Sequence, residues 1–237
     1  MSEASEVAVV ASGPAHSSVS NDLGADINGS QGQTPCRLFL AQKRIFDLAF
    51  CIAVFPIFVG LCVAIYLLNP FFNSGDLFFR QRRCGKDGKE FTMIKFRSMT
   101  SAGEGARGAD DPLDVSRITP LGYWMRETKI DELPQIFNVL RGDMSVIGPR
   151  PEAAHFVETY RQSIPSYGVR STVKPGITGY AQVVQGYTDN IEMVRRKTEL
   201  DYFYVQNMGW RLDLVIIAKT FRLITGSALR PSRDWPI

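Results

Sequence analysis

The sequence has few of the residues from which metal and disulfide sites are usually built. It contains two histidines and four cysteines, and the cysteines form no Cys-x-x-Cys pair. A histidine-based zinc site is therefore disfavoured, and a reducing compartment fits better than a disulfide framework. The sequence also lacks a P-loop, a Gly-x-Ser-x-Gly motif and an Asp-x-Asp metal motif. Common signatures of nucleotide hydrolysis, serine hydrolysis and metal-dependent glycosyl transfer are thus missing.

Basic and aromatic residues are absent from the start of the chain. Residues 1–36 carry four acidic residues and no Lys or Arg, and residues 1–35 contain no Phe, Trp or Tyr. Such a segment cannot bury enough apolar surface to order itself, so we expect residues 1–36 to be a disordered tail. The whole chain carries +3 and the tail −4, which leaves +7 for the remainder. That charge favours anionic partners such as phosphates, acidic lipid headgroups or nucleic acid.

Charge is also absent from a long apolar run, Leu48 to Leu68, which has 21 residues. This length is typical of a membrane helix, although a buried core helix is the alternative. Pro56 lies near the middle and removes a backbone hydrogen bond, which bends a helix. Basic residues flank the run on both sides and favour the cytoplasmic face for both ends. We therefore predict a re-entrant helical hairpin over residues 37–72. The flanking residues are Lys43, Arg44, Arg80, Arg82, Arg83 and Lys86.

The next segment predicts a β-hairpin close to the membrane. Leu77–Arg83 and Glu90–Met99 have strand-like composition, and Lys86–Lys89 supplies a turn with Gly at the tight position. On a strand, Lys95 and Arg97 point the same way and form a cationic face. The alternative is an ordinary solvated basic surface.

Two adjacent carboxylates, Asp131 and Glu132, precede an amphipathic run. Apolar residues follow at helical spacing as far as Leu140, and Arg141-Gly142 supplies a stop. We expect Asp131 to cap this helix, with Pro134 tolerated in its first turn. Free N–H groups at a helix start favour anions. Such a pair either is a structural cap or has a chemical function, and this segment alone leaves both open.

The rest of the chain predicts a mostly helical domain. Residues 101–118 have the composition of a mobile loop, and residues 173–183 that of a rigid loop leading to a short strand. The last helix either lies in the membrane interface or packs against the domain. We expect an α+β fold: a small cytoplasmic catalytic domain over residues 73–237, with a β-hairpin and interfacial amphipathic helices. The helices are expected over Leu121–Lys129, Glu152–Gln162, Ile191–Gln206 and Trp210–Ile224.

Several motifs, in order over residues 40–225, resemble the bacterial sugar transferases. These are small monotopic phosphoglycosyl transferases of polysaccharide and glycoconjugate assembly. The motifs are Lys95–Met99, Asp131–Gln135, Asn138–Ser145, Gly148–Pro151, Lys174–Gly179 and Asp201–Val205.

This resemblance implies transfer of a sugar-1-phosphate from a UDP-sugar to a polyprenyl phosphate such as undecaprenyl phosphate, with release of UMP. Asp131 would be the nucleophile and form a covalent phosphosugar intermediate, and Glu132 with Asp131 would hold Mg²⁺. Two like unit charges at about 4 Å repel by ~4 kcal/mol at an effective dielectric near 20. A helix N-terminus offsets only ~0.3–1 kcal/mol. Mg²⁺ and basic residues must therefore compensate most of the charge. The residues expected to bind substrate are Lys95, Arg97, Arg126, Arg150, Lys174 and Gln182.

The chain departs from the family pattern at two places. Relatives often carry Ser before the kinking proline, where this chain has Phe55, so Pro56 alone must set the bend. Relatives also often carry an Arg shortly after the Pro-Gly-Ile-Thr-Gly segment, where this chain has Tyr187 and its neighbours. Either another cation such as Arg170 or Lys174 replaces that phosphate contact, or the donor binds differently.

The expected partners are a UDP-sugar, a polyprenyl phosphate and the inner leaflet of the bacterial inner membrane. A homo-oligomer is compatible with the sequence. Nucleic acid is disfavoured, because the basic residues flank a membrane segment and have no interleaved aromatic residues. The alternative from another class is a non-catalytic membrane scaffold of a polysaccharide-assembly complex.

Overall fold

The computed structural model describes residues 36–73, 75–100, 115–185 and 191–229. All of them belong to one compact unit, residues 34–237. The predicted tail lies outside the described residues except for Cys36. Most of the expected loop 101–118 and the stretch around Tyr187 also lie outside them.

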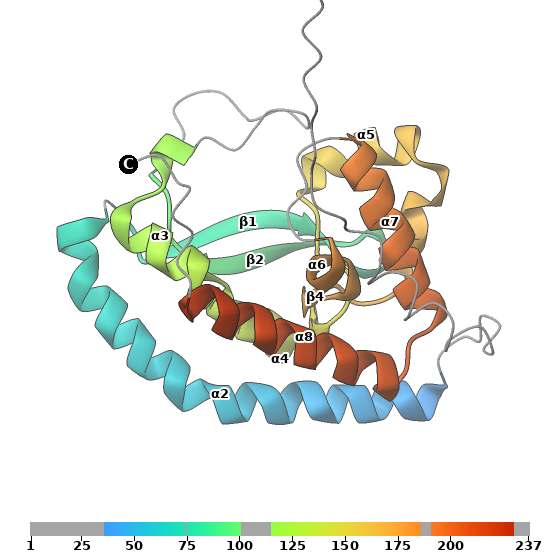
Figure 1. Ribbon diagram of the computed structural model, residues 1–237, viewed down its shortest axis with the longest axis horizontal. Coiled ribbons are helices and arrows are strands. Elements are labelled where there is room, and N and C mark those ends of the chain that lie inside the picture. The colour runs from blue at the N-terminus through green and yellow to red at the C-terminus, as the bar shows by residue number, and fades with distance from the viewer. Residues whose placement is uncertain (1–35, 74, 101–114, 186–190, 230–237) are drawn as a thin grey trace, which may run out of the picture. The chain divides into compact units, whose positions relative to one another are not determined.

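The longest element is α2 (Arg37–Phe72), a helix of 36 residues that contains Pro56 and Pro70. Figure 1 shows that its second part turns away from the direction of the first. An internal proline removes a backbone hydrogen bond, so Pro56 accounts for a bend in this region. The helix is long and apolar enough to cross a membrane, and only 17% of its most apolar window is buried. A buried core helix is therefore the wrong interpretation, and the re-entrant path stays a prediction.

The predicted β-hairpin is confirmed. β1 (Phe78–Cys84) pairs antiparallel with β2 (Glu90–Phe96), with Phe79 opposite Lys95. A short 3-10 turn, η1 (Lys86–Gly88), joins the strands. Asp87 and Gly88 both have positive φ there, a backbone conformation that Gly and Asp adopt more readily than most residues.

The open edge of β2 is covered by a polar side chain from the next helical segment. That segment consists of η3 (Ile130–Gln135) and α4 (Ile136–Arg141). The Asn138 side chain donates to the Thr92 carbonyl over 2.7 Å, and its oxygen accepts from the Ile94 amide over 3.1 Å. Asn138 thus satisfies two backbone groups that a third strand would otherwise pair. The contact fixes the position of η3 relative to β2.

A second, parallel pair of short strands brings two distant loops together. β3 (Ser145–Ile147) pairs with β4 (Gly176–Thr178). The backbones that follow approach so closely that a Cβ on Gly176 would lie 2.1 Å from the Gly148 nitrogen. Only glycine fits at Gly176, because any side chain would overlap the neighbouring backbone. The expected short strand after Pro175 is therefore confirmed.

The remaining helices surround the two strand pairs (Figure 1). The predicted helices are present, with shifts of up to five residues at their ends. The described chain is mostly helical with small strand pairs, so the α+β class is confirmed. The remaining elements are η2 (Val115–Arg117), α3 (Pro120–Glu127), α5 (Ala154–Ser163), η4 (Pro165–Thr172), α6 (Tyr180–Val184), α7 (Ile191–Gln206) and α8 (Trp210–Leu229).

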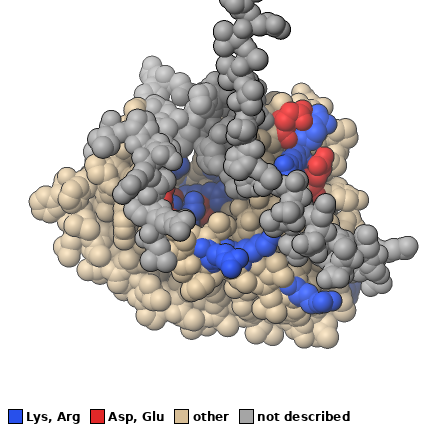
Figure 2. Space-filling model, viewed as in Figure 1, with Lys and Arg blue, Asp and Glu red and all other residues tan. Residues whose placement is uncertain are grey.

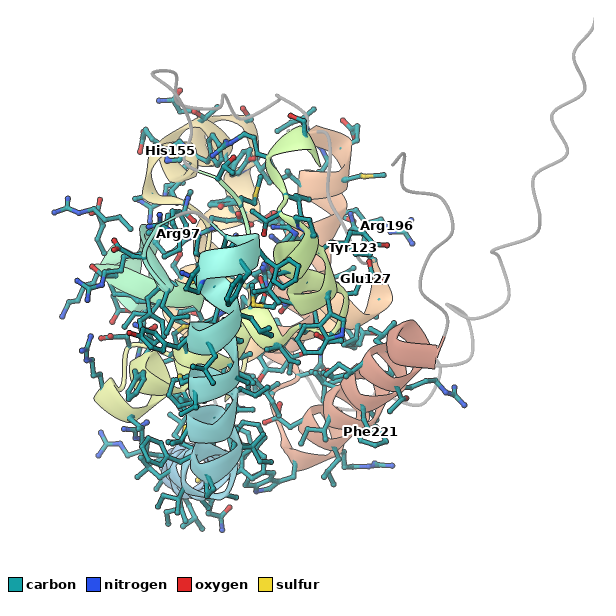
Figure 3. All side chains as sticks on the ribbon, turned by 90° about the vertical axis from the view of Figure 1, so that its left-hand side faces the viewer. Arg97, Tyr123, Glu127, His155, Arg196 and Phe221 are labelled. Carbon is teal, nitrogen blue, oxygen red and sulfur yellow. The ribbon has the colours of Figure 1, made fainter. Side chains whose placement is uncertain are left out.

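The last helix packs against the domain on one side and exposes an apolar surface on the other. Ile216 and Asp213 of α8 are completely buried, so one side packs against the domain. Leu214 and Phe221 are 60% and 69% exposed on the other side. Figure 3 shows Phe221 at the outer surface of α8. An exposed apolar side of this kind suits a helix at a membrane surface.

Polar contacts attach the first part of α2 to the domain. Lys43 forms a buried salt bridge of 2.6 Å with Asp213 of α8. Asp47 accepts hydrogen bonds from the Ser145 hydroxyl over 3.0 Å and the Val146 amide over 2.9 Å. Past the proline, Phe58 packs against aromatic residues of β2 and α4. These contacts fix the orientation of α2 relative to β3, so α2 is not a flexible attachment to the domain.

Candidate active site

The two adjacent carboxylates lie inside a 3-10 helix and not at the start of an α-helix. Lys129 is the residue before η3, and it adopts a left-handed conformation with φ of 59°. Asp131 follows inside η3, so Lys129 and not Asp131 occupies the position before the helix. The prediction that Asp131 caps one continuous helix is therefore wrong. Pro134 lies within η3 and the regular α-helix starts only at Ile136, so the expected helix is divided in two.

Glu132 is held by two cations from different elements. Lys95 of β2 donates to Oε1 over 3.1 Å. Arg150 donates to both carboxylate oxygens, over 2.6 and 3.1 Å. Burial favours the protonated form, yet Arg150 and Lys95 outweigh it and hold the pKa of Glu132 well below its ordinary value. Glu132 is thus a fixed anion with little freedom to move.

Asp131 is as buried as its neighbour but has no hydrogen-bonding or ionic partner in the described part of the chain. Its exposed fraction is 5%, and among the described residues its carboxylate forms no hydrogen bond or salt bridge. Burial raises the pKa of Asp131 above its ordinary value, and the nearby charges of Lys95, Arg126 and Arg150 oppose that rise. A carboxylate whose pKa is raised by burial, and which no described side chain holds, is a candidate for chemistry.

Three of the basic residues expected at the site are brought to this pair. Lys95 and Arg150 contact Glu132, and Arg126 of α3 lies close enough to act on the charge of Asp131. Figure 2 shows acidic and basic side chains meeting near the middle of one face. We name Lys95, Arg126, Asp131, Glu132 and Arg150 the dyad cluster.

The structure places the other expected residues elsewhere. Arg97 follows β2 and approaches Asp76 to 3.7 Å, and Figure 3 shows it near the end of α2. Lys174 lies near Gly142, where the charges that influence it include Arg44 and Asp47 and none from the dyad cluster. Gln182 of α6 donates to the Ile177 carbonyl over 3.2 Å. The cationic face expected from Lys95 and Arg97 is therefore divided between two places.

A second group of buried charges lies behind Arg150 and was missed by sequence analysis. Arg170 contacts Asp201 over 2.9 Å and Glu152 over 3.2 Å, and Lys197 also contacts Glu152. The Tyr167 hydroxyl accepts from Arg170 over 3.0 Å. We name these five residues the Glu152 cluster. The only sequence signal was the presence of Glu152 and Asp201 in or beside motifs, without any sign that they meet.

Arg170 is consequently in no position to bind a substrate phosphate. Its side chain is 6% exposed, and carboxylates, a hydroxyl and a backbone carbonyl occupy its donors. The expectation that Arg170 replaces a missing phosphate contact is not supported by this geometry. A small cavity beside it, of about 20 Å³, has room for roughly one water molecule and not for a sugar nucleotide.

The dyad offers a limited set of ligands for a metal. Within the described ranges, no three His, Cys, Asp or Glu side chains come together at a metal-binding distance. Mg²⁺ usually keeps several waters and takes one or two carboxylates together with substrate phosphates. The unpaired Asp131 and the adjacent Glu132 fit that donor set, provided that phosphates complete it.

A family model described as bacterial sugar transferase matches residues 38–227. The chain belongs to the bacterial sugar transferase family. The match includes nearly all of α2, both strand pairs and the dyad, so the long apolar helix and the candidate site lie within the family region.

Individual bacterial sugar transferases support this assignment. An Aeromonas hydrophila UDP-N-acetylgalactosamine-undecaprenyl-phosphate N-acetylgalactosaminephosphotransferase is 41% identical over 83% of this chain and 47% of its own length. UDP-glucose:undecaprenyl-phosphate glucose-1-phosphate transferases are similar too. The Xanthomonas campestris protein is 38% identical over 78% of this chain and 38% of its own. The Caulobacter vibrioides protein is 36% identical over 76% of this chain and 68% of its own length. The chain thus spans less than half the length of the first two relatives.

Proposed function

We propose that this chain transfers a sugar-1-phosphate from a UDP-sugar to a polyprenyl phosphate and releases UMP. The single observation that supports this most strongly is the dyad, in which Glu132 is paired with Lys95 and Arg150 while Asp131 has no hydrogen bond or salt bridge to any described residue. Family membership and the printed activities of the relatives support the same reaction.

In the first step, an Asp131 carboxylate oxygen attacks the phosphorus that carries the sugar. A new phosphorus–oxygen bond forms to Asp131, and the bond to the bridging oxygen of the pyrophosphate breaks. UMP leaves with that oxygen and its electron pair. The absence of a partner suits Asp131 for this role, because no hydrogen bond must be broken before attack.

In the second step, an oxygen of the polyprenyl phosphate attacks the same phosphorus. The bond to Asp131 breaks, which restores the carboxylate and gives a polyprenyl diphosphate sugar. Dividing the transfer into two displacements means that donor and lipid need not bind together. This suits a soluble donor and a membrane-bound acceptor.

The positive charges of the dyad cluster reduce the repulsion between two anions. Lys95 and Arg150 neutralise Glu132 and also lower the cost of charge on Asp131, and Arg126 adds to that effect. Fixed charges in a buried site stabilise developing charge without reorganising. Mg²⁺ held by Glu132 and Asp131 together with the donor phosphates would neutralise pyrophosphate charge when bound.

We propose that α2 enters the membrane from the cytoplasmic side of the bacterial inner membrane and returns to it. The exposed apolar surface of α2, the internal Pro56 and the basic flanks support this path. The contacts of Lys43 and Asp47 hold α2 on the domain that carries the dyad, which supports a site close to the membrane surface.

The reaction is tested by measuring UMP release from a panel of UDP-sugars in the presence of undecaprenyl phosphate. The panel should include UDP-glucose and UDP-N-acetylgalactosamine, the donors in the names of the relatives. The intermediate is tested with a donor radiolabelled in the sugar, without acceptor. We expect a covalent adduct on the wild type and none on Asp131→Asn. Absence of UMP release from every donor would contradict the proposal and favour a scaffold.

The membrane path is tested by labelling single cysteines introduced before and after α2. We expect a membrane-impermeant maleimide to reach both positions only from the cytoplasmic side. Labelling of either position from the periplasm would contradict the re-entrant path.

A further inference from the structure

The loop that carries Arg150 is fixed by four consecutive backbone carbonyls. Pro149 accepts from the Gly176 amide over 2.9 Å and Glu152 accepts from the Cys84 amide over 2.9 Å. Between them, the Arg150 carbonyl accepts from Arg170 over 2.6 Å, and the Pro151 carbonyl accepts from Arg83 over 3.1 Å. Backbone amides thus hold the two outer carbonyls, and arginine side chains hold the two inner ones.

Arg170 is well suited to hold a backbone atom in place. Its guanidinium reaches Asp201, Glu152, the Tyr167 hydroxyl and the Arg150 carbonyl at the same time. Arginine offers five donors in a rigid planar arrangement, so one side chain can join several fixed acceptors. Since Asp201 belongs to α7 and Glu152 to the loop itself, Arg170 connects the loop to the helical part of the domain.

Arg83 holds the next carbonyl, that of Pro151, from strand β1. It extends from β1, and Gln81 of the same strand accepts a second hydrogen bond over 2.6 Å. Burial and the positive charge of Arg150 lower the pKa of Arg83 to about 10, which leaves it charged at neutral pH. Because both side chains are positively charged, Arg83 does not attract the Arg150 side chain. Arg83 therefore acts on the loop through its hydrogen bond to the Pro151 carbonyl.

We propose that Arg170 and Arg83 are positioning residues that fix the backbone of Arg150 and Pro151 and thereby hold the Arg150 guanidinium on Glu132. The expected effect on turnover rests on the proposed function, whereas the expected effect on the loop backbone does not. Neither arginine forms a hydrogen bond or salt bridge with Asp131 or Glu132 within the described chain. Arg150 makes the two hydrogen bonds to Glu132, so displacement of its backbone misaligns both.

The test combines substitutions in a double-mutant cycle measured as kcat/KM for UMP release. Arg150→Met alone should lower kcat/KM by about 10²–10³-fold, as expected for loss of a fixed charge at the reacting group. Arg170→Met and Arg83→Met alone should each lower it by up to about 10²-fold through misplacement. In the Arg150→Met background, either substitution should cause less than about a twofold further loss, because sites that act through one residue are not additive.

Arg170→Lys and Arg82→Gln are the matched comparisons. Lysine keeps the charge but cannot join four acceptors, so Arg170→Lys should restore only part of the activity. Arg82 lies beside Arg83 on β1 with a side chain 82% exposed, and Arg82→Gln should leave kcat/KM unchanged.

A second measurement does not depend on the reaction. Hydrogen–deuterium exchange of the peptide covering residues 145–154 should be faster in Arg170→Met and Arg83→Met than in the wild type and Arg82→Gln. Losses that multiply in the cycle, or exchange in this peptide that does not change, would overturn the inference. If the wild type releases no UMP, the proposed function fails, and the exchange result alone decides whether the loop is held as we propose.

Discussion

Two groups of buried charges meet at the Arg150 loop, one through the Arg150 side chain and one through its backbone carbonyl, and they differ in whether their carboxylates are paired. In the Glu152 cluster, Arg170 and Lys197 neutralise Glu152 and Asp201, and each carboxylate has a cation within salt-bridge distance. In the dyad cluster there are three cations for two carboxylates, and Asp131 forms no salt bridge among the described residues. One group is balanced, and the other has spare positive charge next to a free carboxylate.

The difference shows that a shifted pKa alone does not identify a reactive group. Burial raises the pKa of Asp201 as it raises that of Asp131, and cations lower the pKa of Glu152 as they lower that of Glu132. Structural ion pairs perturb pKa values as strongly as active sites do. What distinguishes Asp131 is that no side chain in the described ranges pairs with it. The proposed function gives the spare positive charge a role, because an anionic donor would bind there.

The largest effect on activity is expected for Asp131→Asn. The amide cannot act as a nucleophile, so UMP release should fall by several orders of magnitude. The thermal midpoint should not fall, because no hydrogen bond or salt bridge is lost and a buried negative charge is removed. Kinetics and a thermal melt on the same preparation check this. A variant that lost activity only by unfolding would contradict the distinction between the two clusters.

The largest effect on stability is expected for Asp201→Asn. This substitution leaves the buried Arg170 without its closest carboxylate, and breaking one partner of a buried pair costs about 3–5 kcal/mol. Denaturant unfolding in a mild detergent measures the free energy of unfolding. Asp131→Asn provides the comparison, since both variants remove one buried aspartate charge. Equal stability of the two variants would show that the Glu152 cluster is not a structural element.

Sequence analysis predicted the parts of the molecule that depend on local pattern. The β-hairpin, most helices and the long apolar helix follow from periodicity, turn residues and the absence of charge. It failed where distant residues meet. The division between η3 and α4 depends on tertiary contacts such as that of Asn138 with β2, which override a helical pattern.

The residues of the candidate site were predictable where they are close in sequence, and not where they depend on contacts between distant segments. Asp131 and Glu132 were visible as an adjacent pair, and Arg126 and Arg150 as nearby cations in the sequence. Arg97 was expected on the evidence of strand alternation, but β2 ends one residue earlier and Arg97 turns toward Asp76. The pairing of Arg170 with Asp201 joins residues 31 positions apart, and no local pattern encodes such a contact.

A pH-dependent effect of intermediate size is expected for Glu152. Arg170 and Lys197 hold the pKa of Glu152 below the ordinary value of 4.5, so the unfolded chain binds more protons below that value. Stability from Glu152 is therefore fully present above about pH 4.5 and is lost as the pH falls below it. In Glu152→Gln, the decline of the thermal midpoint on acidification should be shallower than in the wild type. Glu158→Gln, on the exposed side of α5, should decline like the wild type.

The smallest effect is expected for an ion pair that belongs to neither cluster. Arg82 and Glu90 approach to 3.4 Å across the hairpin, with side chains 82% and 51% exposed. Solvent and salt screen such a pair, and exposed pairs contribute between 0 and about 1 kcal/mol. We expect Glu90→Gln to change the free energy of unfolding by less than about 1 kcal/mol and to leave UMP release unchanged. If its effect matched that of Asp201→Asn, burial would not be what separates structural ion pairs from surface ones in this molecule.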